Sequence, residues 1–233
     1  MARPVALLLI AAALSGTFLI HRHSESNETV PTFARQGNAN VTLILDAGHG
    51  GEDGGAVSLT GIPESAINLA IVLKTEEIMG LYGICPVLLR REDISLHDST
   101  AETLREKKRS DLENRLAGVE GEEGGVLISI HQNSYPEGQY HGFQAFYAPT
   151  NGSQELAEHI QQTVCTALQP ENNRVSKQIP DAVYLMNHVT CPAVLLECGF
   201  LTNPEEEALL KTPDYQTKMA AAIAAAWLSA PLK

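Results

Sequence analysis

Basic and aromatic residues are scarce in this sequence. The chain of 233 residues has 16 Lys and Arg against 28 Asp and Glu, a formal net charge of −12, and only 5% aromatic residues. Proteins that bind nucleic acid present Lys/Arg stripes with interleaved aromatic residues, so this composition argues against a nucleic-acid partner. We interpret the basic stretch 105–109, which acidic residues flank, as a solvated helix face. The single tryptophan, Trp227, lies in a predicted packing helix, which gives little support to an exposed aromatic platform.

The sequence also lacks cysteine pairs with metal-binding spacing. No Cys-x-x-Cys pair occurs among Cys85, Cys165, Cys191 and Cys198. We interpret these residues as core thiols and keep a disulfide as the alternative. No internal repeat or low-complexity segment follows residue 40, and the length and 44% hydrophobic content fit one α/β domain plus an N-terminal extension.

The first forty residues differ in composition from the rest. Arg3 precedes an uncharged, largely apolar run at 4–20, and a polar stretch follows it. The run is near the lower limit of ~17–25 residues for a membrane-spanning helix and exceeds the ~7–15 residues of a signal-peptide core. The only Ala-x-Ala site, at Ala11 and Ala13, lies inside the run. We therefore favour an uncleaved anchor over a cleaved signal peptide.

This composition predicts three parts. Residues 1–20 form the signal or anchor segment, 21–40 a polar linker, and 41–233 the folded domain. The domain is expected outside the cytoplasm, and only the N-terminal segment is expected to contact a membrane.

Short apolar runs alternate with amphipathic stretches after residue 40. The apolar runs, rich in β-branched residues, predict strands at 41–47, 83–89, 125–131, 142–148, 182–186 and 192–198. Apolar residues at three- and four-residue spacing predict helices at 64–81, 101–119, 153–168 and 214–229. This alternation predicts a single α/β domain with a twisted, mostly parallel sheet of about six strands and helices on both faces.

Two histidines stand at the ends of predicted strands. His49 lies in the glycine-rich stretch DAGHGGEDGGA after the first strand, and His131 closes the third. Glycine clusters mark backbone that bends sharply or approaches something closely. Ligands gather beyond the carboxyl ends of the strands in such sheets, and a buried imidazole needs a partner. The two histidines therefore indicate a metal site.

A carboxylate is expected to complete this site. A catalytic zinc ion takes three protein ligands and keeps a fourth position open, and two histidines with one carboxylate are a common set. Glu64 is the leading carboxylate because it begins a predicted helix from which it can reach His49. Glu52 and Asp53 are the alternatives. Asp46 is expected to orient a ligating imidazole or to shape the turn.

Glu197 interrupts the last predicted strand, in the stretch PAVLLECGF. A buried carboxylate without a partner is costly, which favours a functional reason for it. Hydrolysis at zinc needs a base that is not a ligand, so we predict that Glu197 is the catalytic acid/base. The alternative, an acid that caps the helix near Pro204, fits Glu205 and Glu206 better.

Three segments together resemble the zinc-dependent N-acetylmuramoyl-L-alanine amidases. The stretch DAGHGGEDGGA is similar to the family's first metal motif, ISIHQN to its second, and PAVLLECGFLTNPEE to its catalytic segment. They occur in the family's order, and the resemblance spans about residues 41–229. It implies the zinc ligands His49, Glu64 and His131, with Glu197 as the acid/base.

The resemblance also implies a reaction and a setting. The family hydrolyses the amide bond between the lactyl group of N-acetylmuramic acid and L-alanine in peptidoglycan. The short chain, the N-terminal apolar segment and the stretch LREKKRSDLENRL resemble the spore-cortex amidases of endospore-forming bacteria. For that subgroup the resemblance implies a role in forming muramic δ-lactam together with a partner deacetylase. Muramic δ-lactam is the cortex modification that germination later requires. It also implies an accessory lipoprotein activator and a location between the forespore and mother-cell membranes.

Other residues and other functions stay open. Asn133, Arg174 and His188 are expected to contact substrate or to make ordinary loop hydrogen bonds, and Arg90 or Arg91 takes a structural place in the family pattern. The alternative functions are a zinc exopeptidase of similar architecture and a wall-binding module without catalysis. The retained histidines and glutamates disfavour the module, and the motif order favours the amidase.

Overall fold

The computed structural model describes residues 41–231, which form one six-stranded sheet with the strand order β2-β1-β3-β6-β4-β5. All neighbouring strands run parallel except β4 and β6, which pair antiparallel. The prediction of an α/β fold with a mostly parallel sheet is confirmed. The strands are β1 (Thr42–Ala47), β2 (Val87–Leu88), β3 (Gly125–Asn133), β4 (Gln144–Tyr147), β5 (Lys177–Gln178) and β6 (Ala193–Phe200).

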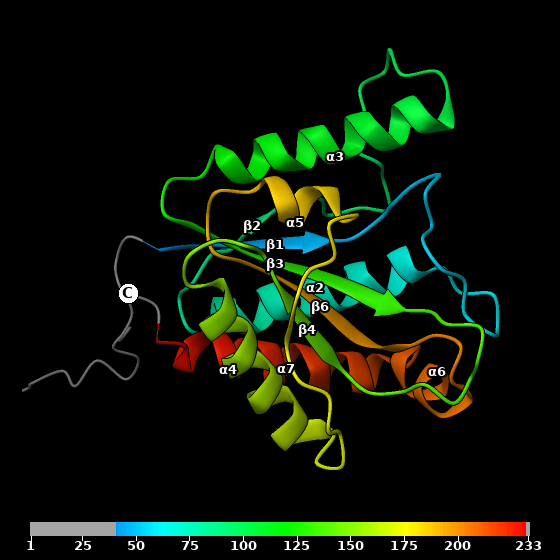
Figure 1. Cartoon of the computed structure of the whole chain (residues 1–233), viewed down its shortest axis with the longest axis vertical. Coiled ribbons are helices and arrows are strands. Elements are labelled where there is room, and N and C mark those ends of the chain that lie inside the picture. The colour runs from blue at the N-terminus through cyan, green and yellow to red at the C-terminus, as the bar shows by residue number, and fades with distance from the viewer. Residues whose placement is uncertain (1–40, 232–233) are drawn as a thin grey trace, which may run out of the picture. The chain divides into compact units, whose positions relative to one another are not determined.

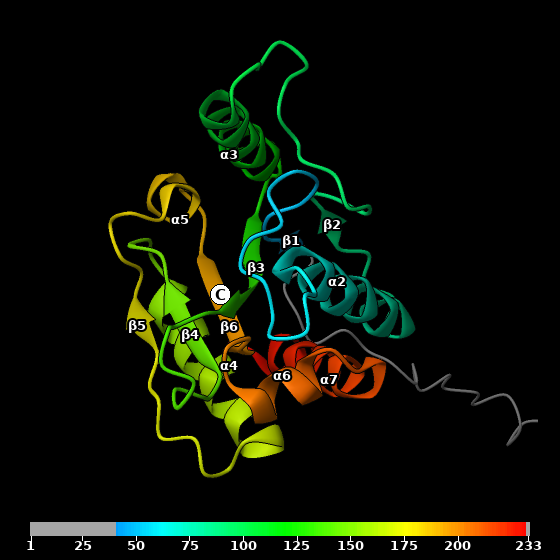
Figure 2. The ribbon, with the colours of Figure 1, turned by 90° about the vertical axis from the view of Figure 1, so that its right-hand side faces the viewer.

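Helices cover both faces of the sheet, as predicted (Figure 1). One apolar cluster lies under α3 and α5, and a second lies under α2, α4 and α7. Figure 2 shows these two layers on either side of the strands. The helices are α2 (Glu64–Leu81), α3 (Leu104–Glu120), α4 (Ser153–Leu168), α5 (Tyr184–His188), α6 (Pro204–Leu210) and α7 (Pro213–Ser229).

The strand register brings polar side chains of three strands to one face. Ile44 points into the cluster under α3 and α5, and because side chains alternate along a strand, Asp46 points to the same face. Asp46 lies opposite Ser129 of β3, and His131 lies opposite Glu197 of β6. These residues are near the carboxyl ends of parallel strands, where the sequence predicts the site.

The predicted strand at 182–186 is wrong, because Tyr184–His188 form the short helix α5. Leu185 and Met186 are both buried in one apolar cluster, whereas neighbouring residues of a strand face opposite sides. A five-residue apolar run fits a strand or a buried helical turn equally well. The sixth strand is instead the exposed β5, which carries no apolar signal.

The predicted strand at 83–89 is largely loop, since only Val87–Leu88 pair with β1. Gly83 has a φ of 71°, and Pro86 has no backbone N–H to donate to a sheet. These residues delay the start of β2 and leave a short edge strand.

The four cysteines are free in the structure. Cys198 is buried, and Cys165 and Cys191 are partly buried, while Cys85 is exposed. The core-thiol interpretation therefore holds for Cys198 and is wrong for Cys85.

No helix within residues 41–231 is long and apolar enough to cross a membrane. The predicted anchor at 1–20 and the linker at 21–40 lie outside the described residues.

Candidate active site

The loop after β1 holds His49 in an uncommon backbone conformation. His49 has a φ of 63°, the single positive φ of a non-glycine residue between 41 and 231. Such a conformation persists where the surroundings enforce it. The Nη2 of Arg115 donates to the His49 carbonyl at 2.7 Å, and the backbone N–H of Gly50 donates to the Asp53 carbonyl at 2.8 Å. The loop is therefore fixed from α3 and by its own hydrogen bonds.

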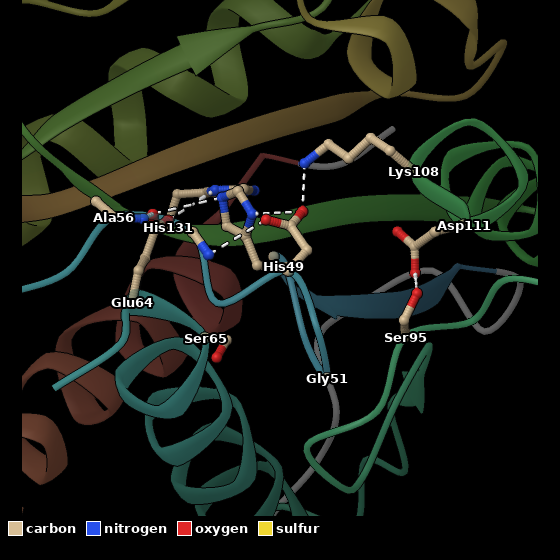
Figure 3. A network of polar contacts seen from close by, with 12 residues as sticks. His49, Gly51, Ala56, Glu64, Ser65, Ser95, Lys108, Asp111 and His131 are labelled. Atoms are coloured by element: carbon tan, nitrogen blue, oxygen red, sulfur yellow. Dashed lines mark hydrogen bonds and ion pairs between the residues drawn. The ribbon is translucent and has the colours of Figure 1, made fainter. Parts of the chain in front are cut away.

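The side chains of His49, Glu64 and His131 meet at the carboxyl end of the sheet. They come from the β1 loop, the first turn of α2 and the strand β3, and Figure 3 shows them pointing toward one another. One nitrogen or oxygen of each lies within 4.8 Å of the others. His49 Nε2 is 3.4 Å from Glu64 Oε2, and His131 Nδ1 is 3.0 Å from Glu64 Oε1.

Glu64 is held as a buried carboxylate. Its side chain accepts hydrogen bonds from the backbone N–H groups of Gln132 and Ala56, both at 3.0 Å, and from Asn68 at 3.2 Å. Burial raises the pKa of Glu64, but the hydrogen bond and charge of His131, together with the His49 charge and the Gln132 N–H, outweigh it and lower the pKa to about 2. Glu64 is thus ionised at neutral pH, the state in which a carboxylate binds a metal.

Two glycines keep this centre clear of side-chain atoms. A Cβ on Gly48 would lie 2.1 Å from Cε1 of His131, and a Cβ on Gly55 would lie 2.6 Å from Oε2 of Glu64. Neither contact is sterically allowed, so the glycine-rich sequence is required by the ring and the carboxylate that it surrounds. Two imidazoles and one carboxylate in such a cradle fit the ligand set of a catalytic zinc ion.

Asp53 lies behind His49. Its Oδ2 is 3.0 Å from His49 Nδ1 and also pairs with Lys108 Nζ from α3, while its Oδ1 accepts the Gly55 N–H at 3.3 Å. A carboxylate on the second nitrogen of a histidine fixes the tautomer and orientation of the ring. The hydrogen bond from His49 lowers the pKa of Asp53 well below its ordinary value. Figure 3 shows Lys108 extending sideways from α3 to this network.

The other alternative ligand, Glu52, points away from the centre and forms an ion pair with Lys107 at 2.8 Å. Lys107 and Lys108 belong to the stretch that the sequence interpreted as a solvated helix face. Lys108 is exposed and Lys107 is partly exposed, as that interpretation expects, and both also pair across to acids of the loop after β1. The matching acidic and basic pairs are far apart in the sequence, so only the fold reveals them.

We predict that Asp53→Asn weakens zinc binding by roughly 10- to 100-fold, the usual effect of removing a carboxylate that orients a ligating histidine. Competition with a calibrated chelator measures this affinity without reference to activity. Glu52→Gln is the matched control, because it removes the adjacent acid and its lysine pair but no contact to a histidine. Equal affinity of the two variants would contradict the positioning role of Asp53.

Glu197 lies beside the three side chains without joining them. It is opposite His131 in the β3–β6 register, and its Oε2 is buried with no hydrogen-bond partner among residues 41–231. Burial raises the pKa of Glu197 to about 7, although the charge of His131 acts in the opposite direction. A buried carboxyl oxygen without a partner, beside a cluster of residues that could hold a metal ion, is suited to exchange a proton with a bound molecule.

Asp46 does not orient a histidine by hydrogen bonding. Its carboxylate instead pairs with Arg115 Nη1 and accepts the Ser129 hydroxyl at 2.7 Å. Arg115 also donates to the Ala47 carbonyl at 3.0 Å and to Asp111 at 2.8 Å. Of the two predicted roles for Asp46, shaping the turn is the one that the contacts support.

The three arginines named in the sequence analysis lie in different surroundings. Arg90 is buried and donates to the carbonyls of Ala47, Gly48 and Ser65, which confirms its structural role, while Arg91 forms a surface ion pair with Glu76. Arg174 Nε donates at 3.1 Å to Gln144, the residue opposite Glu197 in β4.

The other two predicted contact residues lie in different places. Asn133 ends β3 opposite Phe200. His188 is exposed, and its ring stacks on Tyr184 at a centroid distance of 4.0 Å.

A cavity of about 230 Å³ adjoins His49 and His131. Lys108, Leu112 and Arg115 of α3 line one side, and residues 182–186 around α5 line another. Charged and polar side chains line this cavity together with apolar ones, and such a combination is typical of a ligand site. His188 is not among the lining residues.

Comparisons with known proteins give a consistent result. A family model described as N-acetylmuramoyl-L-alanine amidase matches residues 43–228. The chain is 34% identical over 182 residues to the germination-specific N-acetylmuramoyl-L-alanine amidase of Bacillus subtilis, a match that covers 78% of this chain and 76% of that protein.

Solved structures agree with this result. The CwlD amidase from Clostridioides difficile, in complex with the GerS lipoprotein, has a TM-score of 0.77 and 38% identity, covering 81% of this chain and 96% of that chain. The catalytic domain of CwlV, an N-acetylmuramoyl-L-alanine amidase from Bacillus (Paenibacillus) polymyxa, has a TM-score of 0.65 and 28% identity, covering 80% and 96%.

Proposed function

The chain belongs to the N-acetylmuramoyl-L-alanine amidase family, and from this premise we propose that it is a zinc-dependent hydrolase of the lactyl–L-alanine amide bond in peptidoglycan. The observation that carries the proposal is the unpaired, buried oxygen of Glu197 beside the cluster of His49, Glu64 and His131. That arrangement separates a candidate proton carrier from three candidate ligands, which is the division that a hydrolytic metal site requires.

In this proposal His49, Glu64 and His131 hold the zinc ion, and Glu197 moves the proton. A bound zinc ion supplies Lewis-acid chemistry, which polarises a carbonyl oxygen and lowers the pKa of water. Glu197 accepts a proton from the attacking water and later donates it to the departing nitrogen of L-alanine. The ionised Glu64 balances the metal charge, and Asp53 keeps the Nε2 of His49 directed at the centre.

Two alternative functions are less well supported. Family membership favours a muramoyl amide over an ordinary peptide bond, which weighs against a zinc exopeptidase. A binding module without catalysis has no need of a glycine cradle or of a buried, unpaired carboxyl oxygen.

We further propose that the amidase acts in the spore cortex. The relative from Bacillus subtilis is named for germination, and the Clostridioides difficile relative was solved with a lipoprotein bound. By this proposal the enzyme removes stem peptides so that a partner deacetylase completes muramic δ-lactam, and an accessory lipoprotein activates it. Residues 1–20 serve as the signal or anchor, 21–40 as the linker and 41–233 as the catalytic domain, which places the enzyme outside the cytoplasm between the two spore membranes.

A digest of purified peptidoglycan by the full chain, read by mass spectrometry, tests this function. We expect zinc-dependent release of intact stem peptides that begin with L-alanine, and complete loss of release when a chelator removes the metal. Cleavage between amino acids of the stem would instead indicate an exopeptidase. Peptidoglycan from spore cortex and from vegetative cells is compared in parallel, and release from vegetative material alone would contradict the cortex role.

A further inference from the structure

Two exposed tyrosines form an aromatic surface near the candidate site. Tyr135 and Tyr140 are 48% and 41% exposed, and their rings pack edge to face at a centroid distance of 4.7 Å. Tyr140 stacks on the buried Phe200 at 6.4 Å, and the guanidinium of Arg174 lies 5.1 Å from the Phe200 ring. We call these four residues the aromatic shelf.

The loop that carries the shelf is fixed to α6 and its preceding turn. The Tyr135 N–H donates to the Thr202 hydroxyl at 3.1 Å, and Asn203 donates to the Gly138 carbonyl at 2.9 Å. The Gly142 N–H donates to Glu206 at 3.0 Å. A ligand that binds this loop therefore loses little free energy in ordering it.

The aromatic shelf lies further along β6 than Glu197, the proposed proton carrier. His131 pairs with Glu197 in the β3–β6 register, and Asn133 pairs with Phe200 further along the same strands. Three strand residues span roughly 10 Å, so Phe200 lies about that far beyond Glu197 toward the open end of the sheet. Arg174 links the two regions, because it contacts Phe200 and donates to Gln144, which lies opposite Glu197.

The shelf and the cavity beside the histidines are separate surfaces. None of the four shelf residues lines the cavity between α3 and α5. Peptidoglycan presents two parts to the enzyme, a glycan strand that continues in both directions and a peptide branch. A cavity between two helices suits a branch, whereas an exposed, rigid surface suits a strand that runs past the site.

We propose that the aromatic shelf binds a pyranose ring of the glycan strand, one that neighbours the muramic acid whose amide is cleaved. Pyranose rings present C–H groups on one face, which pack on aromatic rings, and hydroxyl groups at the edge, which hydrogen-bond to polar groups. Within the described part of the chain, neither tyrosine hydroxyl has a hydrogen-bond partner, so both remain free for a sugar. This inference rests on the proposed function and adds a glycan subsite to it.

The test compares two substrates with the full chain and its Tyr135→Ala/Tyr140→Ala variant. One substrate is a peptidoglycan strand of several disaccharides, and the other is a single N-acetylmuramoyl tripeptide without a neighbouring sugar. Loss of two aromatic contacts is expected to lower kcat/KM about tenfold on the strand, and by less than about twofold on the single muramoyl peptide. Equal losses on both substrates, or no loss on either, would overturn the proposal.

Two control variants separate stacking from folding. Tyr82→Ala removes a tyrosine of similar exposure, 42%, at the end of α2 and should leave both rates unchanged. Tyr135→Phe/Tyr140→Phe keeps both rings and should retain most of the preference for strands. Loss of that preference with Tyr82→Ala would contradict a specific subsite.

A binding measurement tests the aromatic shelf independently of the proposed amidase activity. A peptide-free tetrasaccharide of alternating N-acetylglucosamine and N-acetylmuramic acid is titrated into the metal-free protein by NMR. Shifts that depend on Tyr135 and Tyr140 would support the shelf even if the wild-type enzyme cleaved neither substrate, a result that would remove the proposed function alone. Absence of binding, or binding unaffected by the double variant, would remove the shelf.

Discussion

Glu197→Gln is expected to lower kcat for release of stem peptides by roughly 10²- to 10⁴-fold, the contribution of a positioned general acid/base. Glutamine has nearly the same shape, so it occupies the buried position without the ability to accept and return a proton. Because Glu197 is not one of the three clustered side chains, zinc content is expected to stay unchanged. Steady-state kinetics on purified muropeptides and metal analysis of the same preparation measure the two effects together.

Each other outcome for Glu197→Gln would contradict a different part of the assignment of Glu197. Retained activity would show that another group carries the proton. Loss of zinc together with activity would make Glu197 a ligand, contrary to the arrangement proposed here. Glu205→Gln, an exposed acid on the neighbouring helix α6, serves as the control and should keep full activity.

The elements that the sequence predicted best are two long helices and the central strands of the sheet. The helices at 64–81 and 153–168 have the predicted bounds, and the central strands β1, β3 and β6 lie within about two residues of the predicted runs. Short segments were predicted less well, because five apolar residues at 182–186 do not distinguish a strand from the helical turn of α5. The exposed strand β5 has two residues and pairs through its backbone, which leaves no pattern in the sequence.

In the candidate site, the clustered residues were predicted from the sequence, but the residues that support them were not. The side chains of His49, Glu64 and His131 were predicted to converge because parallel strands bring their carboxyl ends to one edge, and the structure brings them together. Their role as zinc ligands stays a prediction. The partners that hold them were not predicted, since Lys108 lies 55 residues from Asp53 and their ion pair follows only from the packing of α3.

The aromatic shelf shows why composition is a weak guide to a surface. The low aromatic content gave little support to an exposed aromatic platform, yet one loop presents two exposed tyrosines side by side. Nothing in the spacing of Tyr135 and Tyr140 indicates the edge-to-face contact, because it depends on how residues 134–142 fold against α6.

Arg115→Met is expected to lower the free energy of unfolding by about 3–5 kcal/mol, the usual cost of removing one partner from a buried ion pair. Arg115 is 2% exposed and lies between Asp46 and Asp111, and Asp46 is itself 1% exposed. Methionine fills much of the volume but leaves the Asp46 carboxylate buried without its cation. Urea denaturation at neutral pH, with zinc removed by a chelator, measures the loss without a contribution from metal binding.

Controls for Arg115→Met use one surface pair and one double variant. Arg91→Met removes an exposed arginine that pairs with Glu76, and the urea midpoint should not change measurably. Adding Asp46→Asn to Arg115→Met removes the unpaired charge and should recover part of the lost stability. A double variant no more stable than Arg115→Met would mean that packing, not the buried charge, causes the loss.

The pH dependence of the Arg115→Met defect gives an independent test of its cause. In the wild-type protein burial raises the pKa of Asp46, but the charge and hydrogen bond of Arg115, together with the Ser129 hydrogen bond and the His131 charge, outweigh it, and the pKa lies below the ordinary value. A carboxyl with a lowered folded-state pKa stabilises the fold above its unfolded pKa, and this contribution is lost as the pH falls through the folded value.

Without Arg115, burial dominates and raises the Asp46 pKa, so the ionised carboxylate destabilises the variant at neutral pH. The difference in unfolding free energy between the two proteins should therefore narrow as the pH falls toward the unfolded pKa of about 3.9. A difference that stays constant between neutral pH and pH ~4 would show that the Asp46 charge is not its source.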